Sequence, residues 1–215
     1  MRASGSYPHR GMSCAIFTAA CSITGGLARA AAMITLSSLC LASSAQLRAD
    51  DQALLFDPTG YRIDQFRAPV PATVQGARTI DTEGLRRLLM AEPGATVLID
   101  VLPAPPRPPR LASSTLWLPA PHHSLPTTTW LPNVGYGRLS DALEHYFRSN
   151  LARLTDSDKH RPVVIFCQAD CWMSWNAARR AAEYGYTSVY WYPDGTTGWE
   201  VAGYPLEPTK PVAME

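Results

Sequence analysis

The chain lacks an excess of charge of either sign. Its 215 residues carry 19 Lys and Arg against 18 Asp and Glu, a formal net charge of +1 at neutral pH. A nearly neutral surface offers no electrostatic attraction to nucleic acid or to an anionic membrane. We therefore expect no nucleic acid among its partners, and no membrane contact beyond an export signal. The chain also shows no internal repeat.

Acidic residues are missing from the first 49 positions. This segment instead carries arginines and an apolar stretch, residues 30–41, that leads into small residues. The pattern predicts a signal peptide at residues 1–45, with cleavage after Ala49 as the alternative. The apolar stretch is short for a membrane span, and an uncleaved anchor is the competing interpretation. We expect a periplasmic protein, and about 170 residues remain after cleavage, enough for one domain with a core.

Cysteine is scarce outside this leader. Cys14, Cys21 and Cys40 lie within it, so that only Cys167 and Cys171 belong to the body of the protein. The first of these two ends the apolar run 163–167, and a helical pattern follows the second. Proteins with an α/β fold place their chemistry at such a junction, where helix amides favour a thiolate. In an oxidising compartment the two thiols should be reactive.

Apolar runs alternate with helical patterns from residue 78 onward. The expected strands are 78–80, 96–101, 163–167 and 188–192, and the expected helices follow Asp81, Ser140 and residue 173. Asp81 and Ser140 are suited to capping helix starts, and Gly185 is suited to a left-handed helix stop. Continuous apolar strands that alternate with helices predict an α/β fold with a parallel sheet flanked by helices.

Prolines define two irregular regions. Residues 46–75 contain Pro58, Pro69 and Pro71, which predicts an extended N-terminal arm lying on the domain. Residues 103–133 contain nine prolines, and a stretch so long without regular structure is usually functional or disordered. Trp117 and Trp130 lie within it, and large apolar side chains of this kind favour an ordered proline-rich wrap over disorder.

The order of strand, Cys167, loop, helix, Gly-Tyr and strand, ending in GWEVAGYPL at 198–206, resembles a rhodanese domain. The upstream segment 79–101 matches the opening of that fold. The resemblance implies a rhodanese-like domain at residues 76–207, followed by a tail at 208–215.

A narrower resemblance rests on the phrases LPNVGYG at 131–137 and CWMSWNAA at 171–178. They resemble an exported rhodanese-like subgroup with a C-x-x-x-C-W motif, which is linked to catabolism of alcohols by pyrroloquinoline quinone (PQQ)-dependent enzymes. This resemblance implies a role as an accessory to PQQ-dependent alcohol oxidation, with periplasmic alcohol-oxidation or electron-transfer proteins as partners.

The active-site loop departs from the pattern of a sulfurtransferase. Met173 stands where the family has an anion-binding Arg, and no Lys or Arg lies between Arg161 and Arg179. A thiosulfate dianion needs an Arg fork as well as amides, and Asp170 would repel it. We expect little thiosulfate:cyanide sulfurtransferase activity, and expect that replacing Asp170 by Gly and Met173 by Arg would raise it.

The predicted site consists of Cys167 and Cys171 with the loop residues Gln168, Ala169, Asp170, Trp172, Met173 and Ser174. Cys167, at the strand end, is expected to be the more acidic, attacking sulfur, and Cys171 to resolve the adduct.

Several interpretations of this pair stay open. The first is a dithiol–disulfide oxidoreductase site, and the second is a sulfurtransferase-like site with a sulfane sulfur on Cys167. The third is a passive Cys167–Cys171 disulfide, in a non-catalytic binding module or a structural accessory of the alcohol-oxidation system. Metal or haem ligation is the least favoured: Trp172 stands where haem attachment needs His. We predict no metal site, because the conspicuous metal-ligand source, His122 and His123, is expected at the solvated surface, and we predict no cofactor beyond the sulfur itself.

Overall fold

The computed structural model describes residues 54–112, 114–115 and 120–214. The predicted signal peptide and Trp117 lie outside these residues. The elements in chain order are β1 (Arg78–Thr79), α2 (Thr82–Ala91), β2 (Val97–Asp100), β3 (His122–Ser124), β4 (Thr129–Trp130), α3 (Asp141–Leu154), β5 (Val163–Phe166), α4 (Trp172–Glu183), β6 (Val189–Tyr192), α5 (Gly195–Val201) and β7 (Glu207–Thr209).

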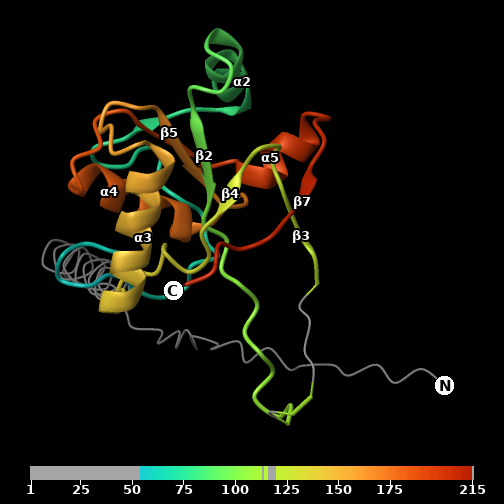
Figure 1. The fold of residues 1–215 in the computed structure, drawn as a ribbon. Helices are drawn as coiled ribbons and strands as arrows, with labels where there is room; N and C mark the ends of the chain where they lie inside the picture. Colours follow the sequence, from blue (N-terminus) through green and yellow to red (C-terminus); the bar gives the residue numbers. More distant parts are fainter. Residues whose placement is uncertain (1–53, 113, 116–119, 215) are drawn as a thin grey trace, which may run out of the picture. The chain divides into compact units, whose positions relative to one another are not determined.

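Five short strands form a parallel sheet in the order β1-β6-β5-β2-β4. Ile165 in β5 lies between Ile99 of β2 and Trp191 of β6, so the carboxyl ends of the three central strands share one edge. This arrangement confirms the predicted α/β fold with a parallel sheet flanked by helices. Figure 1 shows α3 and α4 on one side of the sheet and α5 on the other.

The side chains of each central strand alternate between two apolar clusters. In β5, Val163 and Ile165 pack with residues of α3 and α4, whereas Val164 and Phe166 pack with Leu85 of α2 and residues of α5. The strands are therefore buried on both faces, which explains why their sequences are continuously apolar. Cys167 continues this alternation and faces the cluster with α3 and α4.

The expected helix boundaries are confirmed at three positions. The Asp81 carboxylate accepts a hydrogen bond from the Gly84 amide, and the Ser140 hydroxyl accepts one from the Leu143 amide. Gly185 has φ +89° after α4 ends. Each signal is local in the chain, and local signals of this kind can be read directly from sequence.

Helix α4 begins earlier than the sequence suggested. Its first residue is Trp172, and Cys171 is the N-cap. The expected start, Ser174, lies inside the first turn, where its hydroxyl donates to the carbonyl of Cys171. Trp172, Met173 and Ser174 are consequently helical, and the connecting loop consists of Gln168, Ala169 and Asp170.

The proline-rich wrap contains regular structure that was not expected. Two short strands, β3 and β4, lie within residues 120–133. β4 extends the parallel sheet beside β2, and β3 pairs with β7 in antiparallel fashion. Trp130 is buried, in keeping with the expected ordered wrap, and its indole donates to the carbonyl of Leu102.

Residues 54–75 form an extended arm without a helix or a named strand. Its backbone makes isolated bridges, one between Phe56 and Arg62 and another between Arg67 and Cys171. Val74, near its end, is buried in the core. The arm therefore follows the domain closely and passes over the cysteine loop.

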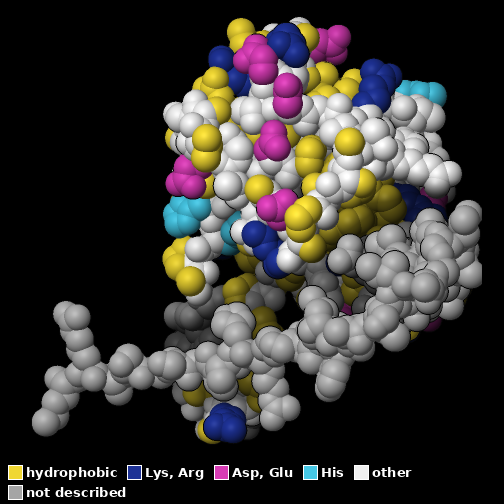
Figure 2. All heavy atoms as spheres, turned by 180° about the vertical axis from the view of Figure 1, so that it is seen from behind, with side chains coloured by type: hydrophobic (Ala, Val, Ile, Leu, Met, Phe, Trp, Pro, Cys, Tyr) yellow, Lys and Arg dark blue, Asp and Glu magenta, His cyan; other side chains and the backbone are white. Residues whose placement is uncertain are grey.

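On the face drawn in Figure 2, acidic and basic side chains are interspersed over the described residues. This distribution agrees with the near balance of charges in the sequence. Within the described ranges, no helix is long and apolar enough to cross a membrane.

Candidate functional site

The structure brings the two cysteines together at the carboxyl edge of the sheet. Cys167 follows β5 directly, and Cys171 is the N-cap of α4. Both are free thiols with only 1% and 2% of their surface exposed. The side chains of Cys167 and Cys171 lie beside each other and interact. The site is therefore a pair of buried thiols in direct contact.

The surroundings of the two sulfurs separate their acidities. Burial, the hydrogen bond to Cys171 and the nearby Asp100 raise the pKa of Cys167. The hydrogen bond from Cys167, the amides of Met173 and Ser174, and the Arg67 guanidinium lower the pKa of Cys171 to about 7. Amides at the start of a helix stabilise a thiolate in this way.

The position of α4 and the surroundings of the two sulfurs favour the opposite order of acidity to the one expected. The sequence placed Cys167 in the cradle of helix amides, but α4 begins directly after Cys171, so its amides serve that sulfur. Asp170, expected to disfavour the Cys171 thiolate, is exposed to solvent and is not among the groups that shift it. Cys171 is the more acidic thiol, and Cys167 stays protonated beside it.

Met173 has no room for the charged residue that a sulfurtransferase carries at this position. It is 1% exposed and packs in the cluster between the sheet and the helices α3 and α4. An Arg here would bury its guanidinium without a partner, which argues against the expectation that this substitution would raise activity. Next to Met173, the Ser174 hydroxyl is held between the carbonyl of Cys171 and the indole of Trp191.

The start of α5 supports the loop from the other side. The Thr196 amide donates to the carbonyl of Cys167 at 2.9 Å, and the Ala169 amide donates to the Thr197 hydroxyl. Gly195 lies so close that a Cβ built on it would stand 2.4 Å from the Cys167 carbonyl oxygen. Only glycine permits this approach, so Gly195 holds the thiol loop in place.

The N-terminal arm covers the thiol loop. The Ala68 amide donates to the carbonyl of Asp170 at 3.2 Å, and the Trp172 amide donates to the carbonyl of Phe66 at 2.9 Å. Arg67 lies opposite Cys171 between these two bonds. The arm thus pairs with the loop like a short antiparallel strand and closes the site from solvent.

Arg67 is a functional candidate that the sequence analysis missed. Its guanidinium donates to the carbonyl of Ala169 and lowers the pKa of Cys171. The loop itself carries no Lys or Arg, as expected, but the fold supplies a cation from a segment about a hundred positions away. No local motif signals such a contact, because it depends on how the arm crosses the domain.

Trp172 anchors this arm. Its indole donates to the carbonyl of Pro69, and its ring lies 4.7 Å from the Arg62 guanidinium and 5.4 Å from the Phe56 ring. The buried Asn176 side chain, one turn further along α4, bonds both the amide and the carbonyl of Arg62. Trp172 therefore holds the arm against the cysteine loop.

A second polar cluster lies at the end of β2. The buried Asp100 carboxylate accepts hydrogen bonds from the Leu102 amide, the Ser124 hydroxyl and His122 Nε2, at 2.6 to 2.8 Å. The His122 ring also packs against Trp130, with centroids 4.4 Å apart. The expectation of a solvated His122 is therefore wrong, whereas His123 is exposed. No group of three metal-ligating side chains occurs within the described ranges.

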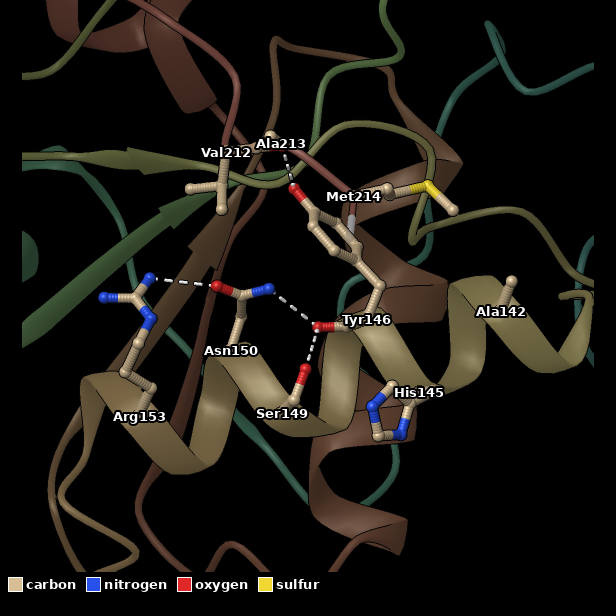
Figure 3. A pocket seen from close by; sticks show the side chains of 9 residues that line it. All are labelled: Ala142, His145, Tyr146, Ser149, Asn150, Arg153, Val212, Ala213 and Met214. Carbon is tan, nitrogen blue, oxygen red and sulfur yellow. Dashed lines mark hydrogen bonds between the residues drawn. The ribbon is translucent and has the colours of Figure 1, made fainter.

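The cavity shown in Figure 3 lies elsewhere in the molecule. It has a volume of about 290 Å³ and separates α3 from the C-terminal segment 212–214. Its polar groups are engaged with each other: Asn150 donates to the Tyr146 carbonyl and accepts from Arg153, and the Tyr146 hydroxyl donates to the Val212 carbonyl. The cavity therefore belongs to the docking of the C-terminal segment and contains neither thiol.

Comparison with known proteins gives a family for the part of the chain that carries the site. The family model described as rhodanese-like domain matches residues 133–202, which include β5, the cysteine loop, α4, β6 and α5. A search of curated proteins finds no match.

Solved structures that match are distant in sequence. One is an uncharacterized protein from Saccharomyces cerevisiae, at 18% identity and a TM-score of 0.35, with 59% of this chain and 93% of that chain covered. Another is the polysulfide-sulfur transferase homodimer from Wolinella succinogenes, at 21% identity and a TM-score of 0.39, with 61% and 79% covered. Residues 133–202 are therefore similar to a rhodanese-like domain, and this part of the chain includes β5, which presents Cys167 at the carboxyl edge of the sheet.

Proposed function

We propose that this rhodanese-like protein performs thiol chemistry with Cys171 as the attacking sulfur and Cys167 as its partner. One observation carries the proposal: two free thiols lie beside each other where the end of β5 meets the start of α4. A thiolate stabilised by helix amides is the form of cysteine that attacks sulfur. A protonated neighbour in contact with it is placed to complete the exchange.

In thiol–disulfide exchange, the Cys171 thiolate attacks one sulfur of a partner protein's disulfide. The partner's disulfide bond breaks, a mixed disulfide forms on Cys171, and the partner's second cysteine leaves as a thiolate. The Cys167 thiol then transfers its proton to that leaving thiolate and attacks the Cys171 sulfur. The products are a Cys167–Cys171 disulfide and a partner with one thiol and one thiolate, which takes a proton from solvent, so two electrons have passed to the partner.

A sulfane-sulfur donor offers the same first step. The Cys171 thiolate attacks the outer sulfur of the donor, the donor's sulfur–sulfur bond breaks, the rest of the donor leaves as a sulfur anion that carries the bonding pair, and a persulfide forms on Cys171. The rhodanese-like fold supports this alternative, which differs from the disulfide reaction only in the second step. The sulfur carrier, expected from sequence to be Cys167, is on this proposal Cys171.

We further propose that the protein works in the periplasm as an accessory to PQQ-dependent alcohol oxidation. The acid-free leader supports export, and the C-x-x-x-C-W phrase supports the link to alcohol oxidation. Periplasmic redox proteins would supply the disulfide or the sulfane sulfur. Co-purification of the exported protein with an alcohol dehydrogenase, lost in the Cys167→Ser, Cys171→Ser double variant, tests this part.

A non-catalytic binding module is the second candidate, and the burial of the site favours it. The two thiols are almost fully buried in the core cluster, and the arm is hydrogen-bonded to their loop. On this alternative the pair stays reduced and unreactive in the folded protein.

Mass spectrometry of the exported protein, with and without reductant, separates these outcomes. A pair that is oxidised by loss of two hydrogens, or that carries one extra reducible sulfur on Cys171, supports thiol chemistry. A Cys167→Ser variant should retain the adduct on Cys171, and a Cys171→Ser variant should lose it. A pair that stays unmodified after treatment with disulfides and polysulfides would refute the proposal and support the binding module.

A further inference from the structure

We propose that the arm segment Phe66–Pro69 occupies the place of an extended segment of the partner protein, whose reactive cysteine takes the position of Arg67. This inference rests on the proposed thiol chemistry of Cys171 and names the partner that the site accepts. The partner is a protein that presents a disulfide in an extended segment, and the arm must lift before it binds.

The contacts between arm and loop are made mainly by backbone atoms. The Ala68 amide bonds the Asp170 carbonyl, and the Trp172 amide bonds the Phe66 carbonyl. The Trp172 indole adds a bond to the carbonyl of Pro69. None of these bonds requires a particular side chain on the arm, so another extended segment can make the same set.

The register places position 67 directly opposite the reactive sulfur. The two backbone hydrogen bonds join the residues on either side of Arg67 to the residues on either side of Cys171. Arg67 and Cys171 therefore form a non-hydrogen-bonded antiparallel pair. Side chains are closest in such pairs, with Cβ atoms about 4.5–5.5 Å apart. A cysteine at position 67 therefore lies within reach of a disulfide to Cys171.

The arm is fastened on both sides of this segment. Upstream, the backbone of Arg62 is bound by the buried Asn176 side chain. Downstream, Val74 is buried in the core. The segment between them can leave the loop while its ends stay attached, so removal of the cover does not require the domain to unfold.

The neighbouring surface sets a preference for the partner's sequence. The Phe66 ring packs against Tyr136 with centroids 5.4 Å apart, beside a cavity of about 220 Å³ that Ile63 and Arg138 also line. The partner residue before the cysteine should therefore be aromatic or apolar. The residue after it needs a free amide for the Asp170 carbonyl and is not proline.

A disulfide trap tests the register. In an Arg67→Cys variant on a Cys167→Ser background, where no thiol can resolve the product, mild oxidation should link position 67 to Cys171, and peptide mapping should show this disulfide. The matched control is Ala68→Cys, because its side chain points to the other face of the arm. Equal linkage from both positions, or none from position 67, would overturn the register on which the proposal depends.

Competition with a peptide tests whether the arm blocks the partner's place. The probe is the blocked peptide Phe-Cys-Ala-Pro, its cysteine held in a mixed disulfide with a small thiol, and adducts on Cys171 are trapped in a Cys167→Ser background. Ala68→Pro removes one arm hydrogen bond and should speed adduct formation about five-fold. The control is Ala72→Pro, whose amide donates no hydrogen bond among the described residues.

A second peptide with N-methylalanine in place of alanine lacks the amide that would bond Asp170, and it should react about five-fold more slowly. Equal rates for the two peptides, or for Ala68→Pro and Ala72→Pro, would overturn the inference. Reaction with hydroxyethyl disulfide distinguishes a failure of the docking inference from a failure of the proposed function. If it modifies Cys171 while the peptides show no preference, the docking inference alone fails; if neither reacts, the proposed function fails.

Discussion

At the scale of the residue, Met173 shows how burial overrides a family pattern. Its side chain is 1% exposed in the main core cluster. We predict that Met173→Arg lowers the free energy of unfolding by about 3–5 kcal/mol, because it buries a charge without a partner. Urea denaturation measures this loss. The control Met173→Leu should cost less than about 1.5 kcal/mol, and an Arg variant as stable as that control would show that the site has room for a charge.

The candidate residues themselves could be predicted from the sequence, whereas their roles could not. Cys167 and Cys171 are identified by spacing and by the apolar run before them, which are local features. Which sulfur is acidic depends on where α4 begins and on Arg67, and the structure resolves both against the expectation. The N-cap of α4 lies only two residues from its predicted position, but this difference reverses which of the two thiols is expected to be more acidic.

At the scale of the element, the junction between β5 and α5 holds the loop in place. Gly195 has φ +54°, and a Cβ there would stand 2.4 Å from the Cys167 carbonyl oxygen. We predict that Gly195→Ala costs about 2–4 kcal/mol, from the left-handed backbone and the clash together. Thermal unfolding and the alkylation rates of both cysteines should change.

Gly203 provides the matched control at the other end of α5. It has φ +82°, but nothing lies within 4 Å of its added Cβ. Gly203→Ala should therefore show only the backbone cost, about 1–2 kcal/mol, with unchanged alkylation rates. If the two alanine variants behave alike, the close approach of Gly195 does not support the loop.

The central strands and the helix caps could be predicted because their signals lie within a few residues. β2, β5 and β6 are continuous apolar runs, and Asp81 and Ser140 cap their helices as expected. β3, β4 and β7 are two or three residues long and depend on pairing with distant segments. β3 and β7 contain histidine, serine and proline, which do not predict strands, and β4 has only two residues, too few for a strand pattern.

At the scale of the whole molecule, the predicted export would set the redox conditions in which the two thiols work. We predict that the precursor is cut near Ala45, because the leader lacks acidic residues and ends in small ones. Amino-terminal sequencing of the periplasmic fraction checks this. A mature protein that begins at Met1, Met12 or Met33 would contradict the prediction and would imply that the thiols work in a different compartment.

We propose that Cys171 is the reactive thiolate and that Cys167 stays protonated beside it. Alkylation of the reduced protein across pH, followed by peptide mapping, measures both thiols at once. Because its pKa is lowered to about 7, Cys171 should be labelled first, with a rate that rises through pH 7 and levels off above it. Cys167, whose pKa is raised, should remain unlabelled over the same range. Labelling of Cys167 first, or at equal rates, would contradict the account.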